Sequence, residues 1–355
     1  MTLKLGIIGA GNIFRAQHIQ AWLQHPEVEV VAVCDINANR AKLAADDYNI
    51  PHAYQSHKTL LENEHLDIID ICAPNSVHAE LAIDSLMAGK HVFCEKPDAI
   101  TVDQAIAMST ASEQSGKLLM TMRNNRFRPT SQWLKRYIQE GNMGEIYTGR
   151  CGWVRRRGIP GKGGWFTTKA LSGGGPLIDL GVHYIDLAMW LMGNPTPISV
   201  TGATYQKFAK NELSDSIHSQ FGEKKSNGTF DVEDLATGFI RFDNGATLQI
   251  EFSWASNIGE EMSFLELRGT NAGCAMKRGE LEVFTEVSGQ LTNMKPVVPK
   301  ITSAHHENIK HFVDCVFGRS EPTICPQDGI EMIKILNAIY LSANTGYEIR
   351  LSDMN

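Results

Sequence analysis

An aspartate and a histidine stand four residues apart in the segment 173–186, whose sequence is GGGPLIDLGVHYID. Pro176 suits the first turn of a helix and Gly193 its end, so Asp179 and His183 are expected on one helical face. A histidine with a pKa near neutrality can accept the proton of a weakly acidic hydroxyl group. A carboxylate one turn away can orient the imidazole or the substrate, although an isolated pair of this kind is more often structural.

Lys96 is a second candidate for this chemistry. It follows the apolar run His91–Cys94 in the sequence Glu95-Lys96-Pro97. A lysine ammonium beside a reacting oxygen stabilises developing alkoxide character, and in the reverse direction it polarises a carbonyl. A lysine and a histidine together would supply what the oxidation of a secondary alcohol needs, which is a proton acceptor while hydride leaves the carbon.

A glycine-rich turn near the N-terminus indicates nucleotide binding. The run Gly9-Ala10-Gly11-Asn12-Ile13-Phe14 follows an apolar strand and begins a helical pattern, which would place a pyrophosphate at a helix N-terminus. Asp35 stands 35 − 11 = 24 residues beyond Gly11, where a carboxylate can accept the ribose hydroxyls. This favours NAD, and Arg40 keeps NADP open. Because Phe14 replaces the third small residue of the fingerprint, a tight turn with an ordinary capping aspartate is the alternative. The cofactor contacts predicted here are Gly9, Gly11, Asn12, Ile13, Asp35 and Arg40.

Short apolar runs alternate with helical patterns through residues 1–122. Strands are expected at Leu3–Ile8, Val28–Val33, Ile68–Ile71, His91–Cys94 and Leu118–Thr121, and helices at Gln17–Gln24, Ala38–Tyr48, Ser76–Ala88 and Val102–Ser115. This alternation predicts an α/β fold that begins with a Rossmann domain built on a buried parallel sheet.

The pattern changes in residues 123–355, which are predicted to form an α+β domain with a largely antiparallel open sheet. Alternation places Leu248, Ile250, Phe252 and Trp254 on one face, and Asn244-Gly245 indicates a hairpin. Helices are expected at Trp133–Gln139, Leu177–Met192, Glu307–Phe317 and Gly329–Asn344. The polar stretch Gln206–Asp231 is expected to be a long loop or flap.

Several motifs in this order resemble the Gfo/Idh/MocA family of oxidoreductases, which includes glucose–fructose oxidoreductase and inositol dehydrogenase. They are the N-terminal glycines, Ala73–His78, the Gly89–Pro97 segment with its Glu-Lys-Pro sequence, and the 173–186 segment with its Asp-x-x-x-His pair. The run Asp328–Ala343 is similar to that family's closing helix. The resemblance therefore covers nearly the whole chain.

The resemblance implies roles for particular residues. Lys96 and His183 would be the acid–base pair, with Asp179 as their partner, and Lys96–Pro97 would carry a cis peptide bond. Asn75 and His78 would lie near the nicotinamide end of the cofactor, where the alternative is helix capping, and Ala73 and Glu95 are also expected at the cofactor. It further implies an NAD(P)-dependent enzyme acting on a sugar, glycoside or polyol, and a dimer or tetramer formed through the open sheet face.

Substrate contacts are less sharply indicated. The run Arg155-Arg156-Arg157 could hold an anionic group, but alternating side chains let at most two share a pocket. The candidates are Arg126, Arg157 and Trp165, the last of which could stack on a sugar ring or serve as a core residue. Asp186 is equally compatible with a structural role. His305, His306 and His311 are expected on a solvated helix face, so no metal site is predicted.

Composition limits the function classes. The 355 residues carry 33 basic and 40 acidic side chains, a net charge of −7, which does not support nucleic acid as the main partner. Seven scattered cysteines fit a reducing compartment, and the absence of a signal segment or long apolar run fits a cytoplasmic protein without membrane contact. Residues 123–169 contain 11 basic and two acidic residues, a local charge of +9, which could steer an anionic cofactor or substrate.

Two other functions stay open at this point. One is a glycosidase that uses NAD for transient oxidation followed by elimination. The other is a non-catalytic nucleotide-sensing protein, although such a protein has no need of a proton-transfer pair such as Lys96 and His183.

Overall fold

The computed structural model describes residues 2–210 and 221–354. The chain forms two compact units. The first contains residues 1–124 and 302–333, and the second contains residues 125–301 and 334–355. The sequence assigned residues 302–333 to the second domain, whereas in the structure they pack with the first. The chain thus returns to the first unit after the second has been largely built.

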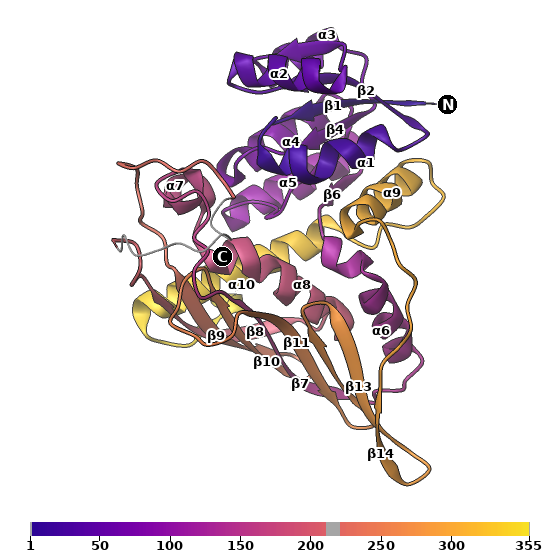
Figure 1. Cartoon of the computed structure of the whole chain (residues 1–355), viewed down its shortest axis with the longest axis vertical. Helices are drawn as coiled ribbons and strands as arrows, with labels where there is room; N and C mark the ends of the chain where they lie inside the picture. Colours follow the sequence, from indigo (N-terminus) through magenta and orange to yellow (C-terminus); the bar gives the residue numbers. More distant parts are fainter. Residues whose placement is uncertain (1, 211–220, 355) are drawn as a thin grey trace. The chain divides into compact units, whose positions relative to one another are not determined.

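The first unit is built on a six-stranded parallel sheet with the order β3-β2-β1-β4-β5-β6. This confirms the predicted Rossmann sheet (Figure 1). Its strands are β1 (Leu3–Ile8), β2 (Val28–Cys34), β3 (His52–Tyr54), β4 (Ile68–Ile71), β5 (His91–Cys94) and β6 (Leu119–Thr121). Its helices are α1 (Ile19–Leu23), α2 (Ala38–Tyr48), α3 (His57–Asn63), α4 (His78–Met87), α5 (Val102–Ser115) and α9 (Ala304–Val316).

Local signals explain where these helices begin and end. The Asn37 side chain accepts hydrogen bonds from the first N–H groups of α2, and Asn49 ends that helix in the left-handed conformation. Thr101 caps α5 in the same way, and Gly116 terminates it. All four residues of β4 are buried, as expected of an interior strand in a parallel sheet.

The second unit contains a nine-stranded sheet with the order β14-β13-β12-β11-β7-β10-β9-β8-β15. Its neighbouring strands are antiparallel except for β7 and β10, which run parallel, so the prediction of a largely antiparallel sheet is confirmed. The strands are β7 (Ile146–Val154), β8 (Pro197–Tyr205), β9 (Leu235–Phe242), β10 (Thr247–Ser253), β11 (Met262–Gly269), β12 (Gly273–Lys277), β13 (Glu280–Val287), β14 (Gln290–Met294) and β15 (Ile349–Arg350).

The second unit also contains helices, of which the one at residues 182–191 packs directly against two strands of this sheet (Figure 1). They are α6 (Pro129–Gln139), the short α7 (Lys169–Ser172), α8 (Val182–Leu191) and the C-terminal part of α10 (Pro326–Thr345). A π-helical turn, η5 (Leu177–Gly181), leads directly into α8. The predicted hairpin joins β9 to β10, and Gly245 supplies its positive φ of 83°.

Alternation along β10 is as predicted, because Leu248, Ile250, Phe252 and the following Trp254 are all buried. The described parts of the expected loop, residues 206–210 and 221–231, contain turns and extended chain, while its residues 211–220 lie outside the described residues. Within the described part of the chain, no helix is both long and apolar enough to cross a membrane.

Candidate active site

The N-terminal glycines form a turn that suits a pyrophosphate. Gly9 has a φ of 101°, and a Cβ on it would lie 2.6 Å from the carbonyl carbon of Cys72, so only glycine fits there. A Cβ on Gly11 would meet nothing within 4 Å, which leaves space beside the turn. The helix begins at Asn12, and the first N–H groups of a helix have no intrahelical acceptors. Gly9, Gly11, Asn12 and Ile13 therefore lie where the chain can accept an anion.

Asp35 is fixed at the end of β2, next to this turn. Its carboxylate accepts hydrogen bonds from the backbone N–H groups of Ala10 at 3.0 Å and Asn37 at 2.8 Å. Arg40 approaches the same carboxylate, with 3.6 Å between Nη1 and Oδ2. These bonds hold the Asp35 carboxylate beside the glycine turn. The half-buried Arg40 lies beside the same carboxylate, where a ribose is expected.

Phe14, which replaces the third small residue of the nucleotide fingerprint, is fully buried and meets the Tyr48 ring edge-on at 5.6 Å between centroids. It begins a π-helical turn (η1, Phe14–His18) that continues into α1. The chain therefore accommodates Phe14 in place of a small residue by burying its ring at the start of the first helix.

The same π-helical turn places His18, which the sequence reading did not single out, between two buried carboxylates. Its Nδ1 lies 2.9 Å from Asp70 Oδ2, and its Nε2 lies 2.7 Å from Glu95 Oε1. The Trp22 indole donates to Asp70 at 2.7 Å. A carboxylate in the middle of the apolar strand Ile68–Ile71 was the sequence signal that could have revealed this cluster.

In this cluster, the pairing of opposite charges outweighs the effect of burial on the pKa values of His18 and Glu95. Burial alone would lower the pKa of His18, but the charge and hydrogen bonds of Asp70 hold that pKa well above its ordinary value. Burial would likewise raise the pKa of Glu95, but its hydrogen bond to His18 and the nearby Lys96 charge lower it to about 2. His18 thus lies between two carboxylates that favour its protonated form, and one of them directly precedes Lys96.

Lys96 is presented by a segment that is otherwise buried. It is partly exposed, whereas every other residue from Val92 to Ala99 is buried. Its backbone N–H donates to Glu95 Oε2 at 3.1 Å, and the Lys96–Pro97 peptide bond is cis, as the resemblance implied. Since hydrogen bonds fix both carboxylate oxygens of Glu95, that residue holds the loop that carries Lys96.

His78 links this loop to the Ala73–His78 segment. Its two ring nitrogens lie 2.8 Å from the Pro97 carbonyl oxygen and 2.9 Å from that of Ala73. Burial lowers the pKa of His78, although the two carbonyls act in the opposite direction. The structure therefore gives His78 backbone partners on both loops, while Asn75 is buried at the start of a short 3₁₀ turn and Ala73 is partly exposed.

In the second unit, Asp179 and His183 reach the surface from a buried helix. Between residues 174 and 191, every residue is buried except these two, which are half-buried. The segment is helical from Pro176 onward, as predicted, but Asp179 lies in the π-helical turn rather than in regular α-helix. This burial pattern leaves one pair of polar side chains at the surface of an apolar helix.

Glu233 holds the beginning of this helix. Its carboxylate accepts hydrogen bonds from the N–H groups of Gly175 at 2.9 Å and Leu177 at 3.1 Å, and from the Tyr340 hydroxyl at 2.8 Å. A Cβ on Gly174 would lie 2.0 Å from the Tyr340 hydroxyl oxygen, so this glycine is required by close approach. Burial holds the pKa of Glu233 above its usual value, although the three hydrogen bonds act in the opposite direction. The sequence reading did not identify Glu233.

Neighbouring side chains position both candidate catalytic residues of this helix. The Trp254 indole donates to Asp179 Oδ2 at 2.9 Å. The Trp153 ring lies 6.5 Å from the His183 ring, measured between centroids, and the Asn125 side chain donates to the His183 backbone oxygen at 3.2 Å. Asp179 thus has a fixed carboxylate, and His183 has an aromatic neighbour.

The candidate substrate residues Arg126, Arg157 and Trp165 each have partners within the protein. Arg126 is buried and forms a two-point ion pair with Asp186, with Nε–Oδ2 and Nη2–Oδ1 distances of 2.8 and 2.6 Å. Arg157 donates to the Arg156 and Ser256 carbonyls and to Asn257. Trp165 stacks on Phe166 at 3.8 Å. Arg126 and Asp186 are thus partners in a buried ion pair.

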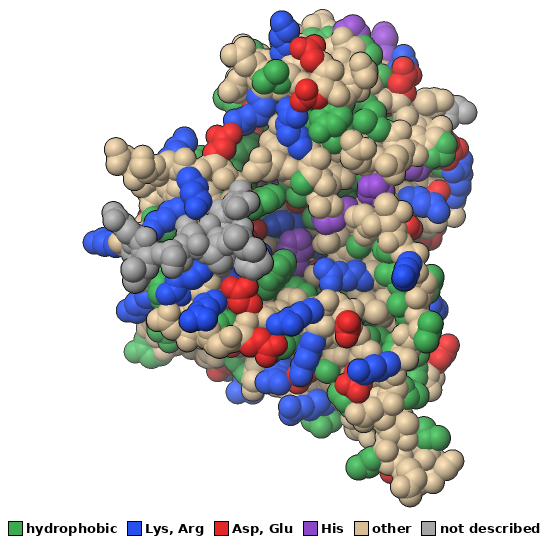
Figure 2. All heavy atoms as spheres, in the orientation of Figure 1, with side chains coloured by type: hydrophobic (Ala, Val, Ile, Leu, Met, Phe, Trp, Pro, Cys, Tyr) green, Lys and Arg blue, Asp and Glu red, His purple; other side chains and the backbone are tan. Residues whose placement is uncertain are grey.

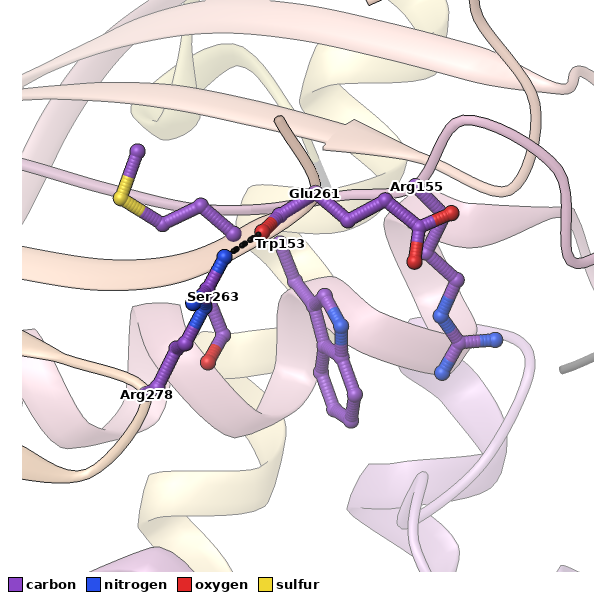
Figure 3. A pocket seen from close by; sticks show the side chains of 6 residues that line it. Trp153, Arg155, Glu261, Ser263 and Arg278 are labelled. Carbon is purple, nitrogen blue, oxygen red and sulfur yellow. Dashed lines mark hydrogen bonds between the residues drawn. The ribbon is translucent and has the colours of Figure 1, made fainter. Parts of the chain in front are cut away.

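A cavity of about 300 Å³ lies instead at the end of β7 (Figure 3). It is lined by Trp153, Arg155, Glu261, Met262, Ser263 and Arg278. Trp153 and Arg155 project from the same face of the sheet, as expected for residues two apart at a strand end. Of the three consecutive arginines, Arg155 is the one that lines this cavity.

The basic segment 123–169 is neutralised in part by acids from elsewhere in the chain. Arg123 pairs with Asp98, Arg126 with Asp186, and Arg150 with Glu266. On the face in view, Lys and Arg side chains are interspersed with Asp and Glu (Figure 2). The local charge of +9 is therefore a property of the sequence segment more than of one continuous surface.

Comparison with known proteins agrees with this geometry. A sequence model of an oxidoreductase family with an NAD-binding Rossmann fold matches residues 3–122, and a model of the GFO/IDH/MocA C-terminal domain matches residues 131–274. D-glucoside 3-dehydrogenase of Escherichia coli (strain K12) is 33% identical over 350 residues, which cover 98% of this chain and 97% of the relative.

A levoglucosan dehydrogenase of Pseudarthrobacter phenanthrenivorans is 27% identical over 79% of this chain and 76% of its own. The solved structure of a levoglucosan dehydrogenase in complex with NADH superimposes with a TM-score of 0.87 and 23% identity, over 99% of both chains. The first unit is an NAD-binding Rossmann domain. Together, the two matched domains and the full-length relative show that the chain belongs to the GFO/IDH/MocA family of oxidoreductases.

Proposed function

We propose that this enzyme oxidises a secondary hydroxyl group of a sugar or glycoside, with His183 as proton acceptor and Lys96 as the cation at the reacting oxygen. One observation carries the assignment of these residues. Lys96 is the partly exposed residue of a buried segment in the NAD-binding unit, and His183 shares that property only with Asp179 in its own buried helix. Reactive side chains held by rigid, buried elements are typical of catalytic sites.

The identity of the relatives supports a glycoside as the substrate class. The Escherichia coli relative that matches nearly the whole chain is a D-glucoside 3-dehydrogenase. We therefore propose that the hydroxyl oxidised here is on a glucose ring, with C3 of a D-glucoside as the first position to test. Inositols belong in the same panel, because they present similar ring hydroxyls.

The residues of the chain have separate tasks in this reaction. The glycine turn at Gly9 and Gly11 binds the pyrophosphate, and Asp35 accepts the ribose hydroxyls. Bound NAD supplies the hydride acceptor. His183 takes the hydroxyl proton while the Lys96 ammonium stabilises negative charge on the same oxygen.

Other residues hold these groups in place. Asp179, held by the Trp254 indole, orients the imidazole or a substrate hydroxyl. His78 joins the Ala73 and Pro97 carbonyls, and Glu95 accepts the Lys96 N–H, so both help to position Lys96. Asn75 and Ala73 are kept as candidate cofactor contacts.

The assignment is tested by incubating the purified protein with NAD or NADP and a panel of methyl glucosides, free sugars and inositols. Absorbance at 340 nm is expected to rise with at least one glycoside and NAD. Borodeuteride reduction of the product then places deuterium at the oxidised carbon, and C3 is expected. Release of the aglycone without net NADH would contradict the dehydrogenase and support the glycosidase that uses NAD transiently.

We also propose that the protein is a cytoplasmic homodimer or homotetramer. All seven cysteines are free, and five of them are buried, which suits a reducing compartment. Phe239 on β9 and Phe264 on β11 are half-buried, and each ring has an arginine guanidinium at about 5 to 6 Å from its centroid. Sedimentation velocity is expected to give a particle of two or four chains, and a monomer at micromolar concentration would contradict this.

A further inference from the structure

A buried ion pair lies directly beyond Lys96 in the loop of residues 95–98, called the Lys96 loop below. Asp98 stands two residues after Lys96, and its Oδ2 pairs with Nη2 of Arg123. The Arg123 side chain is 1% exposed and that of Asp98 is 8% exposed, so both charges are almost completely withdrawn from water. Nη1 of Arg123 also donates to the Met122 carbonyl at 3.3 Å. Neither Asp98 nor Arg123 has a task in the chemistry proposed above.

Arg123 is itself fixed within the first unit. Its backbone N–H donates to Asn308 Oδ1 at 2.7 Å, and Asn308 is fully buried on α9. The Asn308 side-chain nitrogen in turn lies 3.7 Å from the Met120 sulfur on β6. Arg123 therefore leaves the parallel sheet already attached to a helix of the same unit. This gives Asp98 a partner whose own position is fixed.

The beginning of α10 lies against the other side of the Asp98 carboxylate. A Cβ on Gly329 would lie 2.3 Å from Asp98 Oδ1 and 2.5 Å from its Cγ, so the carboxylate leaves no space for a side chain there. Gly329 belongs to the first turn of α10, where the helix dipole favours a nearby negative charge. The carboxylate is thus enclosed between a guanidinium and a helix start, all within the first unit.

Stabilisation of the fold alone is a weak reason for such a pair. Withdrawing two charges from water costs free energy that their attraction often only balances, and apolar side chains of similar volume are often as stabilising or more so. A guanidinium–carboxylate pair does fix geometry, because its hydrogen bonds are strong and directional. Glu95 accepts the Lys96 N–H, and His78 Nδ1 lies 2.8 Å from the Pro97 carbonyl oxygen. With Asp98, the loop is therefore held on both sides of Lys96.

We propose that the Asp98–Arg123 ion pair positions Lys96 for the reaction. Both members are positioning residues, which act through the Lys96 loop and not on the substrate. The inference rests on the proposed function, because it assumes the role that Lys96 has there. Misplacing a reacting group by about 1 Å can lower a rate about 100-fold. Loss of the pair is therefore expected to lower kcat while the binding of NAD and substrate is kept.

Three variants separate positioning from stability. Asp98→Asn keeps the size of the side chain and removes its charge. The double variant Asp98→Leu/Arg123→Met replaces the pair with apolar side chains of similar volume. Arg123→Lys keeps the positive charge without the fork of donors.

Glu27→Gln is the matched control. It weakens the ion pair of Glu27 with Arg319, which also joins residues 1–124 to residues 302–333 of the first unit. That pair is half-exposed and lies outside the Lys96 loop. A general effect of removing one ion pair from this unit would therefore be seen in the control as well.

Each protein is measured in four ways. Urea unfolding gives the stability, calorimetry gives the dissociation constant of NAD, and turnover of the glucoside that yields NADH gives kcat and KM. Amide hydrogen exchange of residues 94–99, followed by mass spectrometry, reports on the Lys96 loop itself. Because this last measurement needs no turnover, it is independent of the proposed function.

Asp98→Asn is expected to lower kcat by about tenfold or more, with faster amide exchange in the Lys96 loop. KM and the dissociation constant of NAD should stay within about twofold of the wild type. The double variant should recover the stability lost in Asp98→Asn but should not recover kcat. Arg123→Lys should keep more activity than the double variant, and Glu27→Gln should match the wild type in kcat and in exchange.

Other outcomes overturn the inference. If the double variant regains both stability and kcat, the pair serves the fold alone. A raised KM with unchanged kcat, or amide exchange equal to that of the wild type, would contradict positioning as well. Should Asp98→Asn fail to fold, the double variant decides by the same comparison with the wild type. If amide exchange rises as expected but Lys96→Met keeps normal turnover, the proposed function of Lys96 fails while the effect of the pair on the loop stands.

Discussion

The carboxylate of Glu233 accepts the hydroxyl hydrogen of Tyr340 at 2.8 Å, and the same carboxylate holds the N–H groups that begin the helix of His183. This buried acceptor joins the start of that helix to α10. Since His183 and Asp179 lie on the first turns that follow, their positions depend on Glu233.

Replacing Glu233 with alanine is expected to lower the free energy of unfolding by about 1–3 kcal/mol, because two buried N–H groups lose their acceptor. Tyr340→Phe should cost about 1 kcal/mol, since one donor of three is removed. Urea unfolding measures the loss of stability in both variants. We also expect kcat to fall more in Glu233→Ala than in Tyr340→Phe, because the start of the His183 helix is then held less firmly. The exposed Tyr347 provides the control variant Tyr347→Phe. Equal effects of the two tyrosine variants would contradict the role of Glu233.

Lys96→Met is expected to lower kcat by at least about 100-fold, because the cation at the reacting oxygen is lost. Binding of NAD, measured by calorimetry, should be retained. Lys90→Met, in the chain that leads into the same strand, is the control and should keep normal turnover. Unchanged turnover of the true substrate by Lys96→Met would remove Lys96 from the mechanism.

Asp35→Ala is expected to weaken the binding of NAD more than that of NADP, because the ribose loses its acceptor while the repulsion of a 2′-phosphate disappears. The ratio of the two dissociation constants is the useful quantity. It is insensitive to any fraction of protein unfolded by the loss of the hydrogen bonds to Ala10 and Asn37. A ratio equal to that of the wild type would exclude Asp35 from the ribose site.

The cluster around His18 is expected to make stability depend on pH. The pKa of Glu95 is about 2 in the folded protein, below its usual 4.5, so its ionised form stabilises the fold above pH 4.5. This contribution, on the order of 3 kcal/mol, is lost as the pH falls toward 2. The raised pKa of His18 acts in the opposite sense: its contribution is full below about 6.5 and is lost as the pH rises through the folded value.

Urea unfolding between pH 3 and 7 checks this by comparing the wild type with Glu95→Gln, which keeps an acceptor for His18 but removes the charge. The difference in unfolding free energy should shrink as the pH falls below 4.5. The exposed Glu62 offers Glu62→Gln as a control. A difference independent of pH would mean that the pairing with His18 does not set the ionisation of Glu95.

Variants of the buried Arg126–Asp186 ion pair test whether Arg126 stabilises the fold or binds substrate. Removing one partner, as in Arg126→Met, is expected to cost about 3–5 kcal/mol, because the other charge is left buried. The double variant Arg126→Met/Asp186→Leu should recover much of that loss. Where the variants fold, KM should match the wild type. A raised KM in the stable double variant would return Arg126 to the substrate site.

Much of the first unit could be predicted because its signals are local. Ala38–Tyr48, Ile68–Ile71 and Val102–Ser115 have the bounds expected from apolar periodicity and flanking residues. The missed strand β3 has only three residues, which are exposed or half-buried at the sheet edge, so it carries no apolar pattern. The seven-residue helix α3 was missed as well, since its one fully buried side chain is Leu60.

In the candidate site, the sequence reveals residue types and local spacing, but it does not reveal contacts with distant partners. Motif and spacing singled out Lys96, Asp179 and His183. His18 and Glu233 act through contacts with residues 52 to 107 positions away, which no local pattern records. Which of the three consecutive arginines lines the cavity also depends on tertiary structure. It is set by the end of β7 at Val154 and by the β-bridge between Arg157 and Ala255.

The ring of Phe312 on α9 packs against Phe93 at 5.2 Å and Trp22 at 6.4 Å between centroids, inside the core of the first unit. During synthesis, Phe312 leaves the ribosome some 190 residues after the last strand of the parallel sheet. Domains usually fold in order from the N-terminus as the chain emerges. Here the nucleotide-binding unit cannot complete its core in that order, so Trp22 and Phe93 lack their partner until nearly the whole chain has been made.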